Sequence, residues 1–147
     1  MIIYDGQITK NFNIREFVCK DNFEILLNEQ VLDHIFRLQK FRSWYIRPMV
    51  VSSGYRTKEY NAKVGGSPNS KHILGIATDF LLPLDELEKY NEQRIEEFYN
   101  NIKNKWIELC AQDNLGGGVG FYDKYIHLDS RSNGDYSSGS YAFWDKR

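Results

Sequence analysis

A charged residue inside an apolar run constrains the fold more than any other feature of this chain. The run extends from Ile76 to Leu82 and contains only two polar residues, Thr78 and Asp79. Its length and composition predict a central β-strand. A buried carboxylate is costly unless it is paired or bound to a metal. The chain must therefore bring partners for Asp79 from elsewhere in the sequence.

Two of the three histidines are candidates for these partners. His72 follows a Gly-rich loop and precedes Asp79, and His127 lies in a second apolar run where Val or Ile is expected. His34 lies in a predicted helix and is expected to be an ordinary helical residue. Zinc accepts imidazole nitrogen and carboxylate oxygen, and a catalytic site keeps its fourth position for water. From the residues alone, a metal site and a buried hydrogen-bonded cluster remain equally open.

Charged residues near His127 are candidates for proton transfer. Residues two apart on a strand share a face, so Asp129 lies beside His127, and Arg131 beside Asp129. We predict Asp129 as the general base, with Asp123 as the second choice. Two other roles stay open for Asp129, which are orientation of the His127 ring and a structural ion pair with Arg131.

Two loop residues upstream are candidates for substrate contacts. Arg56 follows Gly54, which permits a sharp turn, and its guanidinium suits a carboxylate or a developing oxyanion. Ser70, two residues before His72, has a hydroxyl suited to a peptide carboxylate. Without further information, both are read as surface loop residues.

The remaining pattern predicts a single α+β domain over residues 1–147, with an antiparallel sheet flanked by helices. Apolar spacing predicts a long helix from about Glu24 to Trp44. Residues 132–140 are predicted to be a Gly/Ser/Asn-rich loop. The other expected elements are a strand at 49–52, a short helix after Thr57, helix over 84–110 with a break near Tyr90, and a strand pair at 119–122 and 125–129.

Composition excludes several classes of protein. The 19 basic and 20 acidic residues give a net charge of −1, which indicates neither nucleic acid nor an anionic membrane as partner. No apolar run approaches the roughly 20 residues of a membrane-spanning helix. We see no secretory signal in the N-terminal segment, so we expect cytoplasmic synthesis. We also expect a monomer. Cys19 and Cys110 are expected to be buried thiols rather than a disulfide.

The motifs together resemble the D-Ala-D-Ala carboxypeptidase family of zinc metallopeptidases, which includes L-alanyl-D-glutamate endopeptidases, and in particular its compact single-domain subgroup. The resemblance spans nearly the whole chain. It rests on Ser53-Gly54-Tyr55-Arg56, Ser70-x-His72, Gly75-x-Ala77-x-Asp79-Phe80, Gly118-Val119-Gly120-x-Tyr122 and His127-x-Asp129-x-Arg131.

The resemblance implies the small α+β fold of hedgehog-like domains and one zinc ion held by His72, Asp79 and His127. It also implies that Arg56 stabilises the oxyanion and that Ser70 contacts the substrate carboxylate. Arg131 and Tyr55 complete the predicted substrate-binding residues.

One position departs from the family pattern. Several branches carry the general base as Glu or Asp three residues before the last zinc histidine, and Lys124 stands there in this chain. The base therefore cannot be transferred by that rule, which leaves Asp129 and Asp123.

The expected function is metal-assisted hydrolysis of the stem peptides of peptidoglycan. A wall substrate without a secretory signal suggests a phage endolysin that reaches the wall after holin-type release. Two alternatives of other classes remain, a non-catalytic metal-containing module that binds peptidoglycan and a structural phage component that penetrates the wall. Intact Arg56 and Asp129 favour the enzyme.

Overall fold

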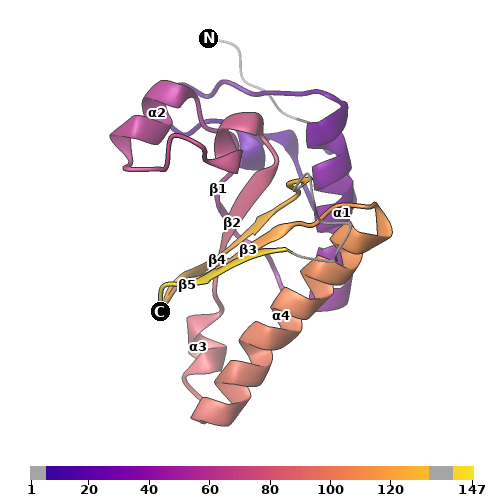
Figure 1. Cartoon of the computed structure of the whole chain (residues 1–147), viewed down its shortest axis with the longest axis vertical. Helices are drawn as coiled ribbons and strands as arrows, with labels where there is room; N and C mark the ends of the chain where they lie inside the picture. The colour runs from indigo at the N-terminus through magenta and orange to yellow at the C-terminus, as the bar shows by residue number, and fades with distance from the viewer. Residues whose placement is uncertain (1–5, 133–140) are drawn as a thin grey trace.

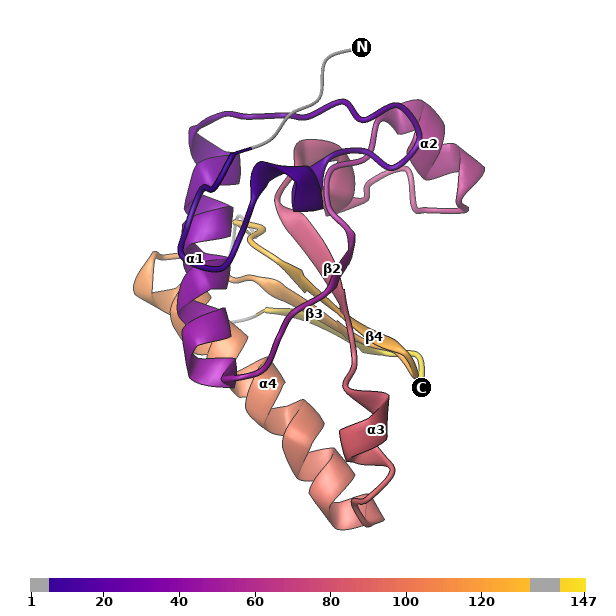
Figure 2. The same cartoon turned by 180° about the vertical axis from the view of Figure 1, so that it is seen from behind.

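The computed structural model describes residues 6–132 and 141–147, which form an α+β fold around one five-stranded sheet (Figures 1 and 2). The strand order is β1-β2-β4-β3-β5, antiparallel except that β5 runs parallel to β3. The predicted class is confirmed, with this parallel edge as a refinement. The strands are β1 (Val51–Ser53), β2 (Ala77–Leu81), β3 (Gly118–Phe121), β4 (Tyr125–Asp129) and β5 (Ala142–Asp145).

Two long helices cover one face of the sheet, and the short helices α2 (Lys58–Lys63) and α3 (Leu84–Leu87) lie beyond opposite ends of it, α2 at the top and α3 at the bottom of the view (Figures 1 and 2). The long ones are α1 (Glu29–Tyr45) and α4 (Glu92–Gln112), which pack against each other. Between them and the sheet lie Phe41, Phe80 and Trp106, all fully buried. The other short elements are η1 (Ile14–Phe17) and η2 (Lys71–Leu74).

Helix α1 begins later than the predicted Glu24. The side chain of Asn28 accepts a hydrogen bond from the backbone of Val31 and caps the helix at this point. Upstream, Phe23 has a positive φ of 61° and its amide bonds to the carbonyl of Cys19, so this segment is a tight turn. A side-chain cap satisfies amides that the first helical turn leaves unpaired, and it decided the boundary.

The helix face of the sheet carries one buried polar cluster, which explains Thr78. His34 of α1 is fully buried, and its ring nitrogens contact Ser130 Oγ at 2.6 Å and Thr78 Oγ1 at 2.9 Å. Burial lowers the pKa of His34 to about 3, so the ring is neutral at ordinary pH. The ring therefore ties α1 to β2 and to the end of β4, as a helical residue outside the metal-ligand set.

The C-terminal region differs from expectation in one respect. Residues 142–145 form β5, which the sequence does not predict, while residues 133–140 of the predicted loop lie outside the described residues. Cys19 and Cys110 are buried free thiols, as predicted. Across the described ranges, no helix has the length and apolar character needed to cross a membrane.

Candidate metal centre

The candidate site is one row of residues that crosses all five strands. Ser53 lies opposite Asp79, Asp79 opposite His127, His127 opposite Gly120, and Gly120 opposite Trp144. Residues directly opposite each other in a sheet project from the same face. This face points away from α1 and α4, because Phe80 and Ile126, the neighbours in β2 and β4, belong to the core. Strand pairing alone therefore places Asp79 beside His127.

His72 joins this pair from η2, and both histidine rings contact the same oxygen of Asp79. His72 Nε2 lies 3.2 Å from Asp79 Oδ1, and His127 Nδ1 lies 2.9 Å from the same oxygen. The three potential ligand atoms lie within 4.8 Å of one another. The exposed fractions of His72, Asp79 and His127 are 3%, 6% and 7%. Such a compact, buried set of two imidazoles and one carboxylate suits a divalent metal.

Local structure fixes the orientation of His72. The Ser70 hydroxyl caps η2 by accepting the His72 amide at 3.2 Å, and Gly75 ends η2 in the left-handed region with φ 72°. His72 Nδ1 donates to the carbonyl of Gly54 at 2.7 Å. A carbonyl can only accept, so Nδ1 carries a proton and Nε2 is the nitrogen directed at Asp79.

The charges in the site also fit a bound cation. Burial favours the neutral form of Asp79, but its side-chain contacts with His127 Nδ1 and His72 Nε2 outweigh it and hold its pKa well below the ordinary value. Burial likewise lowers the pKa of His127, but its bonds to Asp129 and Asp79 raise it to about 9. His127 is therefore an imidazolium between two carboxylates. A divalent cation in place of its Nδ1 proton would also supply positive charge to the two carboxylates.

Asp129 is enclosed by contacts rather than open to the cleft. It is fully buried, and its Oδ2 lies 2.8 Å from His127 Nε2. The Arg131 guanidinium donates to both carboxylate oxygens, at 2.8 and 2.7 Å, and the Arg131 amide donates to Oδ1 at 3.1 Å. Gly118 lies opposite Asp129 in β3 and provides the space for this carboxylate, because a Cβ at Gly118 would lie 2.4 Å from Oδ2.

Arg56 lies beside Asp79 on the other flank. Its Nη2 is 3.5 Å from Asp79 Oδ2, its Nε donates to Ser53 Oγ at 3.0 Å, and its Nη1 donates to Asn61 Oδ1 at 3.3 Å. The carbonyl of His72 accepts the Arg56 amide at 3.0 Å. The loop that leaves β1 is thus bonded to the segment that carries the first histidine, and the guanidinium is held next to the candidate metal position.

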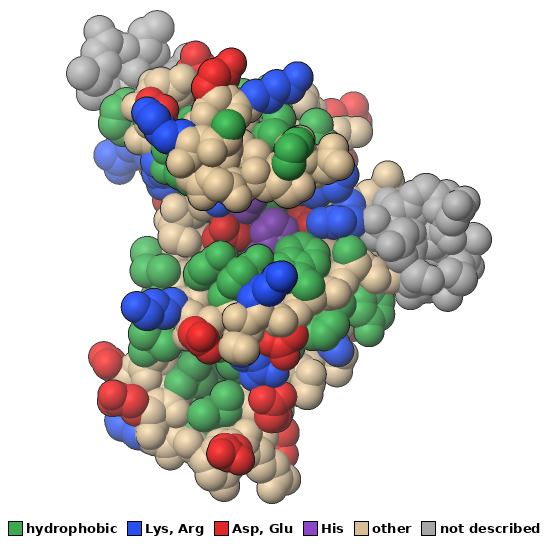
Figure 3. Space-filling model, turned by 60° about the vertical axis from the view of Figure 1, so that its left-hand side comes forward, with side chains coloured by type: hydrophobic (Ala, Val, Ile, Leu, Met, Phe, Trp, Pro, Cys, Tyr) green, Lys and Arg blue, Asp and Glu red, His purple; other side chains and the backbone are tan. Residues whose placement is uncertain are grey.

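The site lies at the bottom of a cleft in two adjoining parts. One part has a volume of about 570 Å³ and the other about 240 Å³. They share Arg56, Val64, Asp79 and Tyr125. All three candidate ligands line the larger part, so the candidate metal position lies there, and Asp79 borders both parts. In the space-filling view, histidine surface shows at a waist between the part of the molecule that contains α2 and the part below it (Figure 3).

Most of the predicted site residues come together in this cleft. Arg56, Ser70 and Arg131 line it with the three candidate ligands. Tyr55 is not among the described residues that line either part, and Asp123 is exposed in the turn between β3 and β4. Sequence reasoning assigned no site role to three aromatic residues that line the cleft, namely Tyr122, which stands in one of the family motifs, Tyr125 and Trp144. The alternating glycines Gly118 and Gly120 were the available signal, since they leave space on one sheet face.

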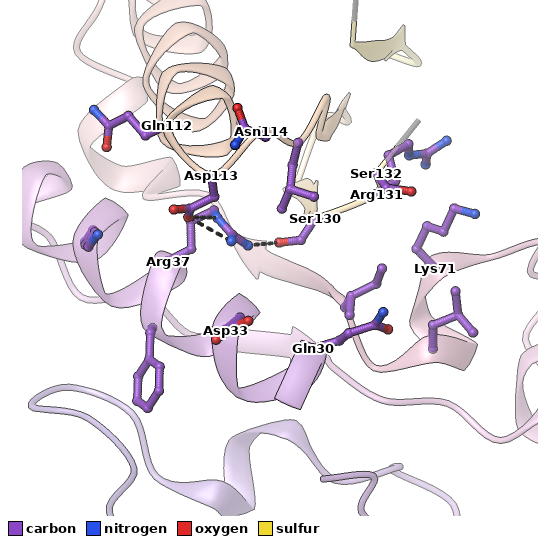
Figure 4. A pocket seen from close by; sticks show the side chains of 15 residues that line it. Gln30, Asp33, Arg37, Lys71, Gln112, Asp113, Asn114, Ser130, Arg131 and Ser132 are labelled. Atoms are coloured by element: carbon purple, nitrogen blue, oxygen red, sulfur yellow. Dashed lines mark hydrogen bonds and ion pairs between the residues drawn. The ribbon is translucent and has the colours of Figure 1, made fainter. Parts of the chain in front are cut away.

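A larger cavity of about 850 Å³ lies elsewhere, between α1 and the end of β4 (Figure 4). Arg37 lines this cavity, and its charge is neutralised by Asp113. The guanidinium donates twice to Asp113 Oδ2 and once to Ser130 Oγ. The three candidate ligands do not line it, so we place the chemistry in the smaller cleft. Lys71 and Arg131 line both spaces.

Comparison with known proteins indicates a family for this chain. No curated protein matches the chain. A family model described as Peptidase M15 matches residues 10–129, a segment that includes all three candidate ligands, Arg56 and Asp129. Because this match covers most of the chain, the protein belongs to the peptidase M15 family of zinc D-Ala-D-Ala carboxypeptidase and endopeptidase-type enzymes.

Proposed function

We propose that this protein is a zinc-dependent peptidase that hydrolyses the stem peptides of peptidoglycan, acting as one catalytic domain over residues 1–147. The observation that carries the proposal is the buried His72–Asp79–His127 set at the bottom of a cleft, within the segment that matches the family. His72 Nε2, Asp79 and His127 Nδ1 would hold the ion. Zinc in such a site polarises the scissile carbonyl and lowers the pKa of a bound water toward neutrality.

We assign to Arg56 the stabilisation of the negative charge that develops on the carbonyl oxygen of the substrate. Its guanidinium is held by Ser53 and Asn61 next to Asp79, so it is oriented before substrate arrives. A preorganised cation of this kind stabilises an oxyanion without rearrangement during the reaction. Ser70 and Arg131 line the larger part of the cleft and are the proposed substrate contacts there.

Asp129 we assign to the orientation of His127. The imidazole Nε2–H donates to Asp129, and metal-bound histidines commonly donate their second N–H to a carboxylate in this way. Both oxygens of Asp129 already accept hydrogen bonds, which supports this role over the predicted one of general base. Asp123 lies outside the lining of the cleft and gains no support as the base.

The two adjoining parts of the cleft support a peptide that extends past the metal position in the larger part toward the smaller part. The bond cut is then either D-Ala-D-Ala at the end of a stem peptide or L-Ala-D-Glu within it. Digestion of purified peptidoglycan, followed by mass spectrometry with and without chelator, separates the two. Loss of one D-Ala identifies a carboxypeptidase, and release of whole stem peptides identifies an endopeptidase and strengthens the proposed role in phage lysis.

The same digestion tests the non-catalytic alternative, and a second assay tests the structural one. A metal-containing module that only binds peptidoglycan would release no product even with zinc bound and with the protein retained on the wall. That result would overturn the proposed peptidase. A wall-penetrating structural component would cut the wall but copurify with virions, which immunodetection on purified particles would reveal.

A further inference from the structure

Trp144 is the residue that closes the row of the metal centre at the edge of the sheet. It lies in β5 opposite Gly120, which in turn lies opposite His127. A Cβ at Gly120 would come within 2.4 Å of the indole Nε1 and 2.5 Å of Cε2. The indole therefore occupies the space over Gly120 that a side chain would fill. As a result, its centroid lies 5.0 Å from that of the His127 ring.

Three contacts hold the indole in this position. Its Nε1 donates to Tyr122 Oη at 2.8 Å. The guanidinium of Arg131, which is itself bound to Asp129, lies over the ring at 5.5 Å. The His127 ring packs at an angle of 47° on the side of the metal position. Because the one polar atom of the indole is already bonded, the half-buried ring offers apolar carbon to the cleft that it lines.

We propose that Trp144 forms an apolar wall for a small aliphatic side chain of the substrate next to the scissile bond. This inference rests on the proposed function, in which an alanine flanks either candidate bond. The wall adjoins a candidate ligand, so a side chain that packs on it belongs to a residue at the metal. The methyl group of alanine is the aliphatic group that either candidate bond would bring there. Trp144 lies C-terminal to residues 10–129, so the family match does not assign it a role.

A pair of substrates and a set of variants test this wall. The substrates are a stem peptide and its analogue in which glycine replaces the alanine at the scissile bond. We expect wild-type kcat/KM to favour alanine by about tenfold, the scale of one methyl group in an apolar pocket. Trp144→Ala should remove this preference, and Trp144→Phe should keep part of it. Trp44→Ala, at an exposed tryptophan of α1, is the matched control and should leave the preference unchanged.

Zinc affinity and tryptophan fluorescence give readouts besides activity. Trp144 offers no ligand atom, so both Trp144 variants should bind zinc with wild-type affinity in a chelator competition. Adding the stem peptide should change the tryptophan emission of the zinc-loaded wild type and leave that of Trp144→Phe unchanged. The Phe variant keeps an apolar ring, so this comparison remains informative even if Trp144→Ala fails to fold.

Three results would contradict the proposed role of Trp144. The first is an unchanged alanine preference in Trp144→Ala, and the second is a peptide-induced emission change that persists in Trp144→Phe. The third is a loss of zinc affinity in Trp144→Phe, which would mean that the ring supports His127 instead. If the wild type cleaves no peptide at all, the proposed function fails. A peptide-induced emission change that depends on Trp144 would then still support the wall.

Discussion

The replacement Asp129→Asn tests how the protein holds its candidate metal. The substitution keeps the size of the side chain but removes the charge that orients the His127 imidazole and binds Arg131. Removing such a partner of a metal-bound histidine typically weakens metal affinity by about 10- to 100-fold, or roughly 1.4 to 2.7 kcal/mol. We expect zinc affinity to decrease by about 10- to 100-fold, and turnover at saturating zinc to change much less.

A chromophoric chelator titrated against the zinc-loaded protein measures this affinity, and peptide hydrolysis in excess zinc measures turnover. Asp113→Asn is the matched control, because Asp113 also pairs with an arginine, Arg37, but in the separate cavity. It should leave zinc affinity unchanged. If Asp129→Asn binds zinc normally and loses turnover by a factor of about 10² or more, the orienting role is wrong and Asp129 is the general base.

Three further perturbations probe the site from other directions. Gly118→Ala should lower the free energy of unfolding by about 1–3 kcal/mol in a urea titration, because the added Cβ meets the Asp129 carboxylate at 2.4 Å; an unchanged midpoint would contradict the packing described. The pKa of His127, raised to about 9 in the folded metal-free protein, gives stability that is complete below the unfolded value near 6.5 and lost as pH rises toward 9. Thermal melts of the metal-free protein should show this decline, while zinc affinity should increase over the same range as the Nδ1 proton leaves; a flat profile would refute the assignment. Arg56→Lys should retain zinc but lower kcat by on the order of 10²-fold, since lysine cannot keep the fork that Ser53 and Asn61 orient; unchanged kcat would remove Arg56 from catalysis.

The sequence predicted those parts of the site whose signal is local. A carboxylate in the apolar run of β2 and a histidine in the apolar run of β4 both conflict with burial unless they meet, and the structure brings them together. The break before α4 was also visible, because Asn91 caps that helix at the predicted interruption. Each of these signals lies within a few residues of the feature that it predicts.

What depends on distant contacts could not be predicted from the sequence. Strand β5 is short and gains its identity from pairing with β3, so its sequence carries little strand signal. Trp144 therefore went unnoticed as a cleft residue. The contacts that enclose Asp129 were not predicted for the same reason. Strand periodicity places the carboxylate beside His127, but it does not show whether the carboxylate remains open to the cleft.

Asp79 and His127 are paired directly across β2 and β4. These two strands should therefore tolerate insertions and deletions less well than the loop before His72 does. A strand alternates its faces at every residue, so one residue gained or lost within β4 before His127 would turn that side chain toward the helices. Within the loop at 65–70, residues 68 and 69 are under no such register. They lie between Ser67, whose carbonyl accepts a hydrogen bond from Asn61, and Ser70, which caps the turn that orients His72. Changes in chain length that alter the rim of the cleft should therefore be accepted in this part of the loop and rejected in the strands.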